Sequence, residues 1–250
     1  MAAPLRQEKG FLAPQSLNLN YPAPLKKFSE QLGGHGEILS MNEDSMIIKP
    51  CNELEREFYE NSVLYPGFAR WMPKYYGTLR LHDSQPSLLD QQENVLTKFK
   101  KPCVMDVKLG TQLWGKDADE RKRQKSIQKA ESTTSSSMGI RITASRVYGK
   151  SSDNYTYYSR EFCRRLTPDT IMTCFADFFM AEISLSQRRL VIDRFIEDLT
   201  LFSEDLENHD VRLHFAHSHF EDGIGKDEGC LLGLRNAIRC LKQVLNEMTN

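Results

Sequence analysis

The chain has 250 residues, of which 40% are hydrophobic and 27% are charged, and its formal net charge at pH 7 is -1. This length allows one substantial core or two modest lobes, and the composition is typical of a globular protein. The near-zero net charge gives no overall reason to expect nucleic-acid binding. No apolar run approaches the roughly 20 residues that span a bilayer, so no transmembrane segment is expected.

The six cysteines are scattered through the chain and contain no C-x-x-C pair. This spacing argues against a zinc ribbon and against a disulfide framework. We therefore expect free thiols in a reducing compartment, which for this chain means the nucleus and cytoplasm.

The first 27 residues are rich in proline and are expected to be a mobile lead-in. Glycines in QLGGHG, which begins at Gln31, predict a tight turn, and residues 37–50 predict two short strands. Asn52 is placed to cap a helix that carries Glu53, Glu55 and Glu57.

The remainder of the chain is mixed and is weighted towards helices. Further strands are predicted within residues 71–83, 93–99, 102–114, 139–148 and 211–217. Helices are predicted within residues 117–131, 167–201 and 227–248, with a Ser/Thr-rich loop after the first.

The strand in PCVMDVKLGTQLW carries two opposite charges on one face, because Asp106 and Lys108 are two residues apart. The rest of this strand is apolar, so the charges must be used or paired. A structural ion pair and a functional pair remain equally open from the spacing alone.

Lys49 ends the apolar strand MIIK shortly after the glycine turn, and a helix with several glutamates follows it. Kinase-like folds hold ATP phosphates with this order of glycine turn, strand lysine and helix glutamate. Both features are common in other proteins, so alone they leave an unrelated fold open.

The nine residues PCVMDVKLG, from Pro102, fit the P-x-x-x-D-x-K-x-G signature of the inositol polyphosphate kinase family. Further motifs of the family occur along the chain in the family's order: QLGGHG, the IIK strand and PKYYG before this signature, and SRVY and FAHS after it. Over about residues 28–250 the chain resembles this family, and most closely its fungal-type multikinase branch.

The resemblance implies an α+β, two-lobed, protein-kinase-like fold with ATP in the cleft between the lobes. It implies an N-lobe at residues 28–97, a C-lobe at residues 98–250 and a basic inositol phosphate-binding helix at residues 117–131.

The resemblance assigns the nucleotide site to both lobes. Lys49 would bind the ATP phosphates with Glu55 as its partner, and Asp106 would contact the nucleotide. The backbone of the segment Glu93, Asn94 and Val95 would contact adenine as a hinge.

The resemblance also assigns a substrate site. Lys108 would contact substrate phosphate near the transferred group, with Arg146 and His217 at the substrate end. Lys122, Lys125 and Lys129 share one face of the basic helix, where a solvated basic face is the alternative.

VRLHFAHSH contains H-x-x-H-x-H, but strand alternation would point His214 away from His217 and His219, which argues against zinc. In the family an Asp that binds magnesium stands at the position of His214, and neutral imidazole is a poor substitute for that carboxylate. The family's S-S-L-L strand is also missing.

These features imply an ATP- and Mg²⁺-dependent kinase that phosphorylates inositol tris- and tetrakisphosphates. The alternative is a catalytically impaired member that serves as an inositol phosphate-binding or transcription-complex scaffold. The absence of H-R-D and D-F-G motifs argues against a protein kinase. Phosphoinositides and transcription factors are further expected partners, and we expect a monomer.

Overall fold

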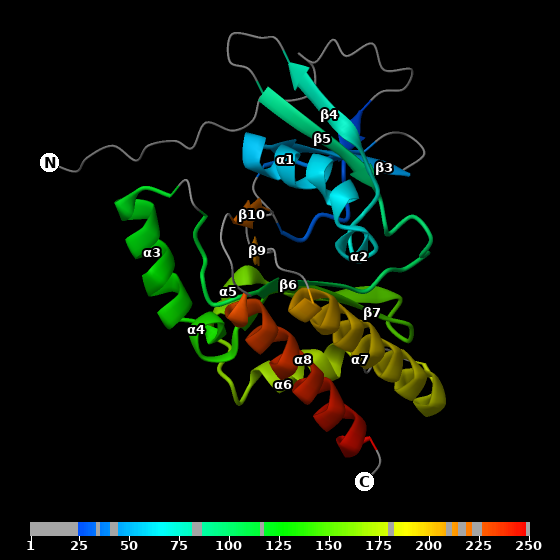
Figure 1. Cartoon of the computed structure of the whole chain (residues 1–250). Coiled ribbons are helices and arrows are strands. Elements are labelled where there is room, and N and C mark those ends of the chain that lie inside the picture. The colour runs from blue at the N-terminus through cyan, green and yellow to red at the C-terminus, as the bar shows by residue number, and fades with distance from the viewer. Residues whose placement is uncertain are drawn as a thin grey trace, which may run out of the picture.

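The computed structural model describes residues 25–33, 36–40, 45–81, 87–115, 118–179, 183–208, 212–214, 219–221 and 227–248. Two separate antiparallel sheets organise this part of the chain, as expected for an α+β protein (Figure 1). The order of strands in the first sheet is β1-β2-β3-β5-β4, and in the second it is β6-β7-β8.

The first sheet is built from the N-terminal third of the described residues. Its strands are β1 (Lys26–Lys27), β2 (Leu39–Ser40), β3 (Met46–Cys51), β4 (Tyr75–Leu81) and β5 (Ser87–Glu93). Leu39, Ile48 and Leu89 are buried together within it. The helix α1 (Glu53–Asn61) starts as predicted, because the Asn52 side chain accepts a hydrogen bond from the Glu55 amide at 2.8 Å.

The second sheet consists of β6 (Val104–Leu109), β7 (Ile140–Gly149) and β8 (Asn154–Tyr158). Its apolar face packs against α6 (Ile171–Phe179) and α8 (Glu228–Glu247) in the largest hydrophobic cluster. α7 (Leu185–Asn208) lies beside α8 (Figure 1). The expected boundary between lobes near residue 97 falls between the two sheets and stays a prediction.

A second hydrophobic cluster joins the two parts of the fold. Phe58 and Phe68, from α1 and α2 (Pro66–Ala69), pack with Phe202 of α7 and with Leu231 and Leu234 of α8. Asp205 of α7 accepts hydrogen bonds from Arg70 and Trp71 beside this cluster. The cluster and this polar contact fix the first sheet relative to the C-terminal helices.

The basic helix α3 (Glu120–Glu131) stands apart from the helical bundle and reaches it through α4 (Thr134–Met138) (Figure 1). Asp119 caps its first turn by accepting a hydrogen bond from the Lys122 amide at 2.6 Å. The short strands β9 (Arg212–His214) and β10 (His219–Glu221) form an antiparallel pair, and β10 lies against α1.

Two sequence predictions of local structure were wrong. Residues 94–98 form turns rather than a strand, because the Asn94 side chain accepts a hydrogen bond from the Leu96 amide at 3.0 Å. The Ser/Thr-rich stretch forms α4 rather than a loop, because Gly139 at φ 63° supplies the left-handed residue that ends a helix.

Three further predictions need correction. The strand within residues 102–114 is half-buried rather than buried, and it ends at Leu109. The helical region 167–201 is two helices, α6 and α7. β8 and the short helix α5 (Arg160–Arg164) were not predicted from the sequence pattern. No helix in the described part of the chain combines the length and apolar character needed to cross a bilayer.

We predict that Leu231→Ala lowers the free energy of unfolding by about 2–5 kcal/mol, because it leaves a cavity in the cluster that joins the two parts. Leu231 is 1% exposed, whereas Leu190 on the outer surface of α7 is 70% exposed. Leu190→Ala is the matched control and should change stability by less than about 0.5 kcal/mol. Urea denaturation measures both, and equal losses would contradict the packing described.

Candidate functional site

Lys49 and Glu55 form the ion pair expected from the sequence. The Nζ of Lys49 on β3 lies 2.5 Å from a carboxylate oxygen of Glu55 on α1, and 5.3 Å from the ring centroid of Tyr59. Burial alone would lower the pKa of Lys49, but Tyr59, Glu55 and Asp90 together raise it above its ordinary value. The ammonium is therefore fixed and fully charged near neutral pH.

Asp106 and Lys108 on β6 also pair, with 3.2 Å between the Lys108 Nζ and an Asp106 oxygen. Both side chains remain partly exposed, so the pair is accessible rather than sealed in the core. The glycine turn lies directly on this carboxylate, since a Cβ added at Gly33 would overlap the Asp106 side chain. A side chain at position 33 would therefore require the Asp106 carboxylate to move.

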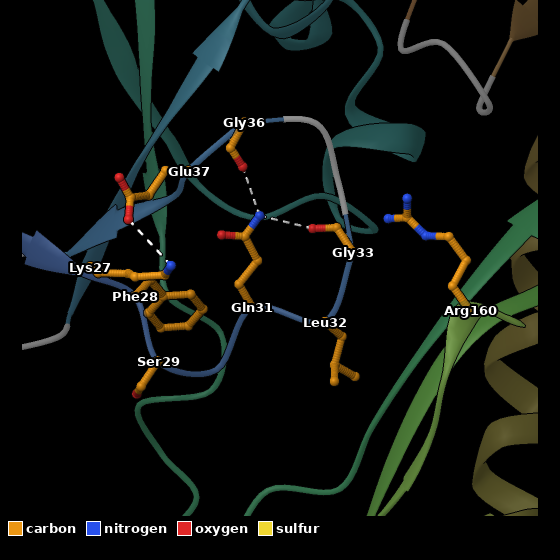
Figure 2. A pocket seen from close by; sticks show the side chains of 9 residues that line it. All are labelled: Lys27, Phe28, Ser29, Gln31, Leu32, Gly33, Gly36, Glu37 and Arg160. Atoms are coloured by element: carbon orange, nitrogen blue, oxygen red, sulfur yellow. Dashed lines mark hydrogen bonds and ion pairs between the residues drawn. The ribbon is translucent and has the colours of Figure 1, made fainter. Parts of the chain in front are cut away.

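The glycine turn is shaped by one side chain. The Gln31 amide nitrogen donates to the carbonyl oxygens of Gly33 and Gly36, at 3.1 and 2.9 Å. Its oxygen accepts from the Ile38 amide at 3.0 Å. Figure 2 shows the contacts of Gln31 with Gly33 and Gly36 at a pocket of about 450 Å³, with Arg160 of α5 across from Leu32 and Gly33.

A β-bulge determines which charged side chains share the face of the second sheet that carries Asp106 and Lys108. The register between β6 and β7 shifts at Asp106 and Val107, and Thr143 of β7 has no direct partner. The Thr143 hydroxyl donates to the Asp106 carbonyl oxygen at 3.2 Å at this point. With the extra residue, Arg141 faces the same side as Lys108, and Arg146 faces the same side as Asp106.

Arg141 is the most notable member of this face, because it is 6% exposed and two of its guanidinium nitrogens have no hydrogen-bond partner. Burial lowers the pKa of Arg141, and Arg164 and Arg160 lower it further, against the effect of Asp106. The pKa of Lys129 at the end of α3 is also lowered, by burial and by Arg141, Arg164, Arg160 and Lys108.

These mutual effects place five cations in one region, which we call the cationic cluster. Its members are Lys108, Lys129, Arg141, Arg160 and Arg164. Like charges gathered in this way raise the free energy of the empty protein, and they fit a ligand with several negative charges.

Lys122 and Lys125 lie on earlier turns of α3 and are exposed. Only Lys129, of the three lysines assigned to the substrate helix, takes part in the cationic cluster as described. The roles of Lys122 and Lys125 stay predictions.

The segment expected to be a hinge lies at the end of β5. Glu93 donates its amide to the Lys74 carbonyl at 2.8 Å, and Asn94 donates its amide to the Ser45 carbonyl at 2.9 Å. Asn94 is buried and Val95 is exposed. A second pocket, of about 350 Å³, is lined by Asn94, Phe28 and Tyr155 among others. Contact with adenine stays a prediction.

Arg146 lies on the same face but away from the cationic cluster. It pairs with Glu30, and its Nη2 donates to the Pro102 carbonyl at 3.3 Å. Its guanidinium carbon is 4.5 Å from the centroid of the Tyr155 ring. Arg146 pairs with Val104 at the start of β6, whereas Lys108 pairs with Arg141 near its end, so the strand separates Arg146 from Lys108.

His214 is the last residue of β9, where its backbone pairs with His219. The side chain of His214 and the whole of His217 lie outside the described residues, so their assigned roles stay predictions. Within the described residues, no three His, Cys, Asp or Glu side chains gather as a set of metal ligands.

Comparison with known proteins supplies the family. The inositol polyphosphate kinase family model matches residues 91–220. An inositol polyphosphate multikinase of Schizosaccharomyces pombe is 35% identical over 204 residues, which cover 76% of each chain.

The chain belongs to the inositol polyphosphate kinase family.

Other relatives agree with this membership. The inositol polyphosphate multikinase of Homo sapiens is 33% identical over 178 residues, covering 64% of this chain and 42% of that protein. The crystal structure of the inositol phosphate multikinase Ipk2 from S. cerevisiae, in complex with ADP and Mn²⁺, superposes with a TM-score of 0.71. That match covers 80% of this chain and 99% of the other at 23% identity, and it supports the predicted kinase-like fold.

Three cations of this family member, Arg141, Arg160 and Arg164, were not predicted from the sequence. Arg141 lies between Ile140 and Ile142 on β7, and both isoleucines are buried in the core. Strand alternation therefore places Arg141 on the opposite face, which is the face of Lys108. Arg160 and Arg164 were missed because α5 was not predicted, although their i, i+4 spacing carries two cations on one helical face.

We predict that Lys129→Met stabilises the unliganded protein at pH 7. Because the pKa of Lys129 is lowered on folding, its charged form opposes folding below that folded pKa, and the cost falls as pH rises towards 10.5. The gain should be about 0.2–1 kcal/mol, as for exposed charges, and should shrink as the pH rises towards 10.5.

Thermal unfolding across this pH range measures the effect, with Lys125→Met as the matched control on the same helix. A loss of stability in Lys129→Met at pH 7, or an equal gain in both variants, would contradict the repulsion inferred for the cluster.

Proposed function

We propose that this chain is an ATP-dependent inositol polyphosphate multikinase, which transfers the γ-phosphoryl group of ATP to hydroxyls of inositol tris- and tetrakisphosphates. The observation that carries the proposal is the cationic cluster, which lies next to Asp106 and the glycine turn. A small ligand with several phosphates would neutralise it, whereas a peptide substrate has no comparable charge density.

Each part of the site has a role in this proposal. Lys49, held by Glu55, binds the ATP phosphates under the glycine turn, and the Glu93–Val95 backbone faces adenine. Lys108 lies between the transferred group and the substrate phosphates, and Lys129 and Arg141 bind the remaining phosphates. Catalysis comes mainly from alignment of the reactants and from neutralisation of charge.

Mg²⁺ is the ion that we propose to accompany ATP. Asp106 offers a hard carboxylate ligand of the kind that Mg²⁺ takes together with nucleotide phosphates. When bound, the ion would neutralise charge on those phosphates. An imidazole at position 214 does not fit this role, because Mg²⁺ prefers oxygen ligands. Asp106 is therefore the residue that we assign to the metal.

Free inositol phosphates are the first substrates to test, and phosphoinositide headgroups belong to the same chemical class. The six unpaired cysteines support a reducing location, which we propose is the nucleus and cytoplasm. We propose a monomer as the active form.

The central experiment is a turnover assay with the purified chain, ATP and inositol trisphosphate, read by mass spectrometry across titrations of Mg²⁺ and Mn²⁺. Formation of a product that is heavier by one phosphoryl group supports the proposal. Absence of product together with absence of inositol phosphate binding by calorimetry would overturn it.

A second candidate function rests on His214. If the substitution removes a required ligand, the chain binds inositol phosphate without phosphorylating it and serves as a scaffold, for example in a transcription complex. Binding of inositol trisphosphate without turnover would favour this candidate over an active kinase.

We predict that Lys108→Ala reduces turnover by at least about a hundredfold, since it removes a cation that stabilises charge near the transferred group. ATP binding should persist, because Lys49 and Glu55 remain in place. Turnover and the Kd for ATP measure the two effects. Loss of ATP binding with an intact fold would show that Lys108 serves the nucleotide rather than the substrate.

We predict that His214→Asp increases turnover by about ten- to a hundredfold, because it returns an oxygen ligand for the metal. His214→Asn is the matched control, since it supplies a weaker, neutral oxygen and should increase turnover less. Both variants should shift the Mg²⁺ dependence to lower concentration. If neither variant changes the rate or this dependence, position 214 is not a metal ligand.

A further inference from the structure

Arg146 is almost completely buried, since only 3% of the residue is exposed. A buried guanidinium is costly unless it is paired. Its partners come from three places: Glu30 precedes the glycine turn, Pro102 precedes β6, and Tyr155 lies on β8. Glu30 is the anionic partner and is therefore the residue that balances this charge.

Glu30 is directly followed by the residue that shapes the glycine turn. Gln31 holds the carbonyl groups of Gly33 and Gly36 and accepts from the Ile38 amide. The Glu30–Arg146 pair thus attaches the base of the turn to the second sheet. The far end of the same turn rests on Asp106, which shares its sheet face with Arg146.

The pair also lies at the pocket beside the expected hinge, since Glu30, Pro102 and Tyr155 are among the residues that line it. Arg146 contacts all three of these residues. It therefore holds the segment of Glu30 against the second sheet at this pocket.

Arg141 provides a contrast on the same strand and the same face. Two of its guanidinium nitrogens are buried without a partner, and its neighbours are cations. Arg146 has a carboxylate, a carbonyl and an aromatic ring as partners, and only its Nε is buried without a hydrogen-bond partner. Arg141 thus offers more unpaired donors to a ligand phosphate, whereas a carboxylate of the protein already balances the charge of Arg146.

We propose that Glu30 and Arg146 act together as positioning residues for the nucleotide, by fixing the glycine turn over Asp106, and that Arg146 is not a ligand of substrate phosphate. This inference rests on the proposed function, since it assumes that the nucleotide lies beneath the turn. It replaces the role that the family resemblance assigns to Arg146.

The test measures binding rather than turnover, with the full chain, ADP with Mn²⁺, and inositol trisphosphate as separate probes. Glu30→Gln and Arg146→Gln should each raise the Kd for ADP about tenfold and leave the Kd for inositol trisphosphate within about twofold. The double variant should be no weaker than either single variant, because both remove one interaction. Arg141→Gln is the matched control and should weaken only inositol trisphosphate binding.

Hydrogen exchange supplies a readout that does not depend on either ligand. Amides of residues 31–33 should exchange faster in Glu30→Gln, while those of β7 should not change. If Arg146→Gln does not fold, Glu30→Gln decides the question alone, because Glu30 is partly exposed and its replacement keeps the side chain's shape.

Three results would overturn the inference. The first is weaker inositol trisphosphate binding in Arg146→Gln with ADP binding unchanged. The second is unchanged ADP binding in Glu30→Gln, and the third is additive losses in the double variant. A wild-type chain that binds neither ADP nor inositol trisphosphate would instead overturn the proposed function, and this inference with it.

Discussion

The structure depends on a division between the two faces of the β6–β7 strand pair. One face packs Val107, Ile140 and Ile142 into the largest hydrophobic cluster, and the other face presents charged side chains to the glycine turn. The bulge at Thr143 is what makes this division complete. Without the extra residue, Arg141 and Arg146 would point to opposite faces, because they are five residues apart on one strand.

The positive charges on the second face are balanced differently at the two ends of the strand. At one end Arg146 is neutralised within the protein by Glu30, so its charge serves the arrangement of the chain. At the other end Arg141 and Lys129 face further cations, and burial lowers the pKa of both. Such unbalanced charge costs folding free energy, and a polyanionic ligand is the physical means of recovering it.

Much of this arrangement could be predicted from the sequence, because the determining signals are local. The cap at Asn52 and the shared face of Asp106 and Lys108 follow from short spacings, whereas the choice of Glu55 as the partner of Lys49 came from the family resemblance. The strand predicted at residues 93–99 was wrong because the Asn94 side chain competes with the backbone for a hydrogen bond. The cationic cluster was only partly predictable, because it combines β6, β7, α3 and α5, whose proximity is set by tertiary packing.

The glycine segment meets the second sheet at two contacts of different kinds. Glu30 is held by a buried guanidinium, whereas Gly33 rests on the partly exposed Asp106 without a side chain of its own. The base of the turn is therefore held by an ion pair, whereas Gly33 approaches Asp106 through its backbone alone. The hydrophobic cluster of α1, α2, α7 and α8 restrains the same two parts of the fold from the other side. The first sheet and the C-terminal part of the fold are thus held together at two places, by the Glu30–Arg146 pair on one side and by this cluster on the other.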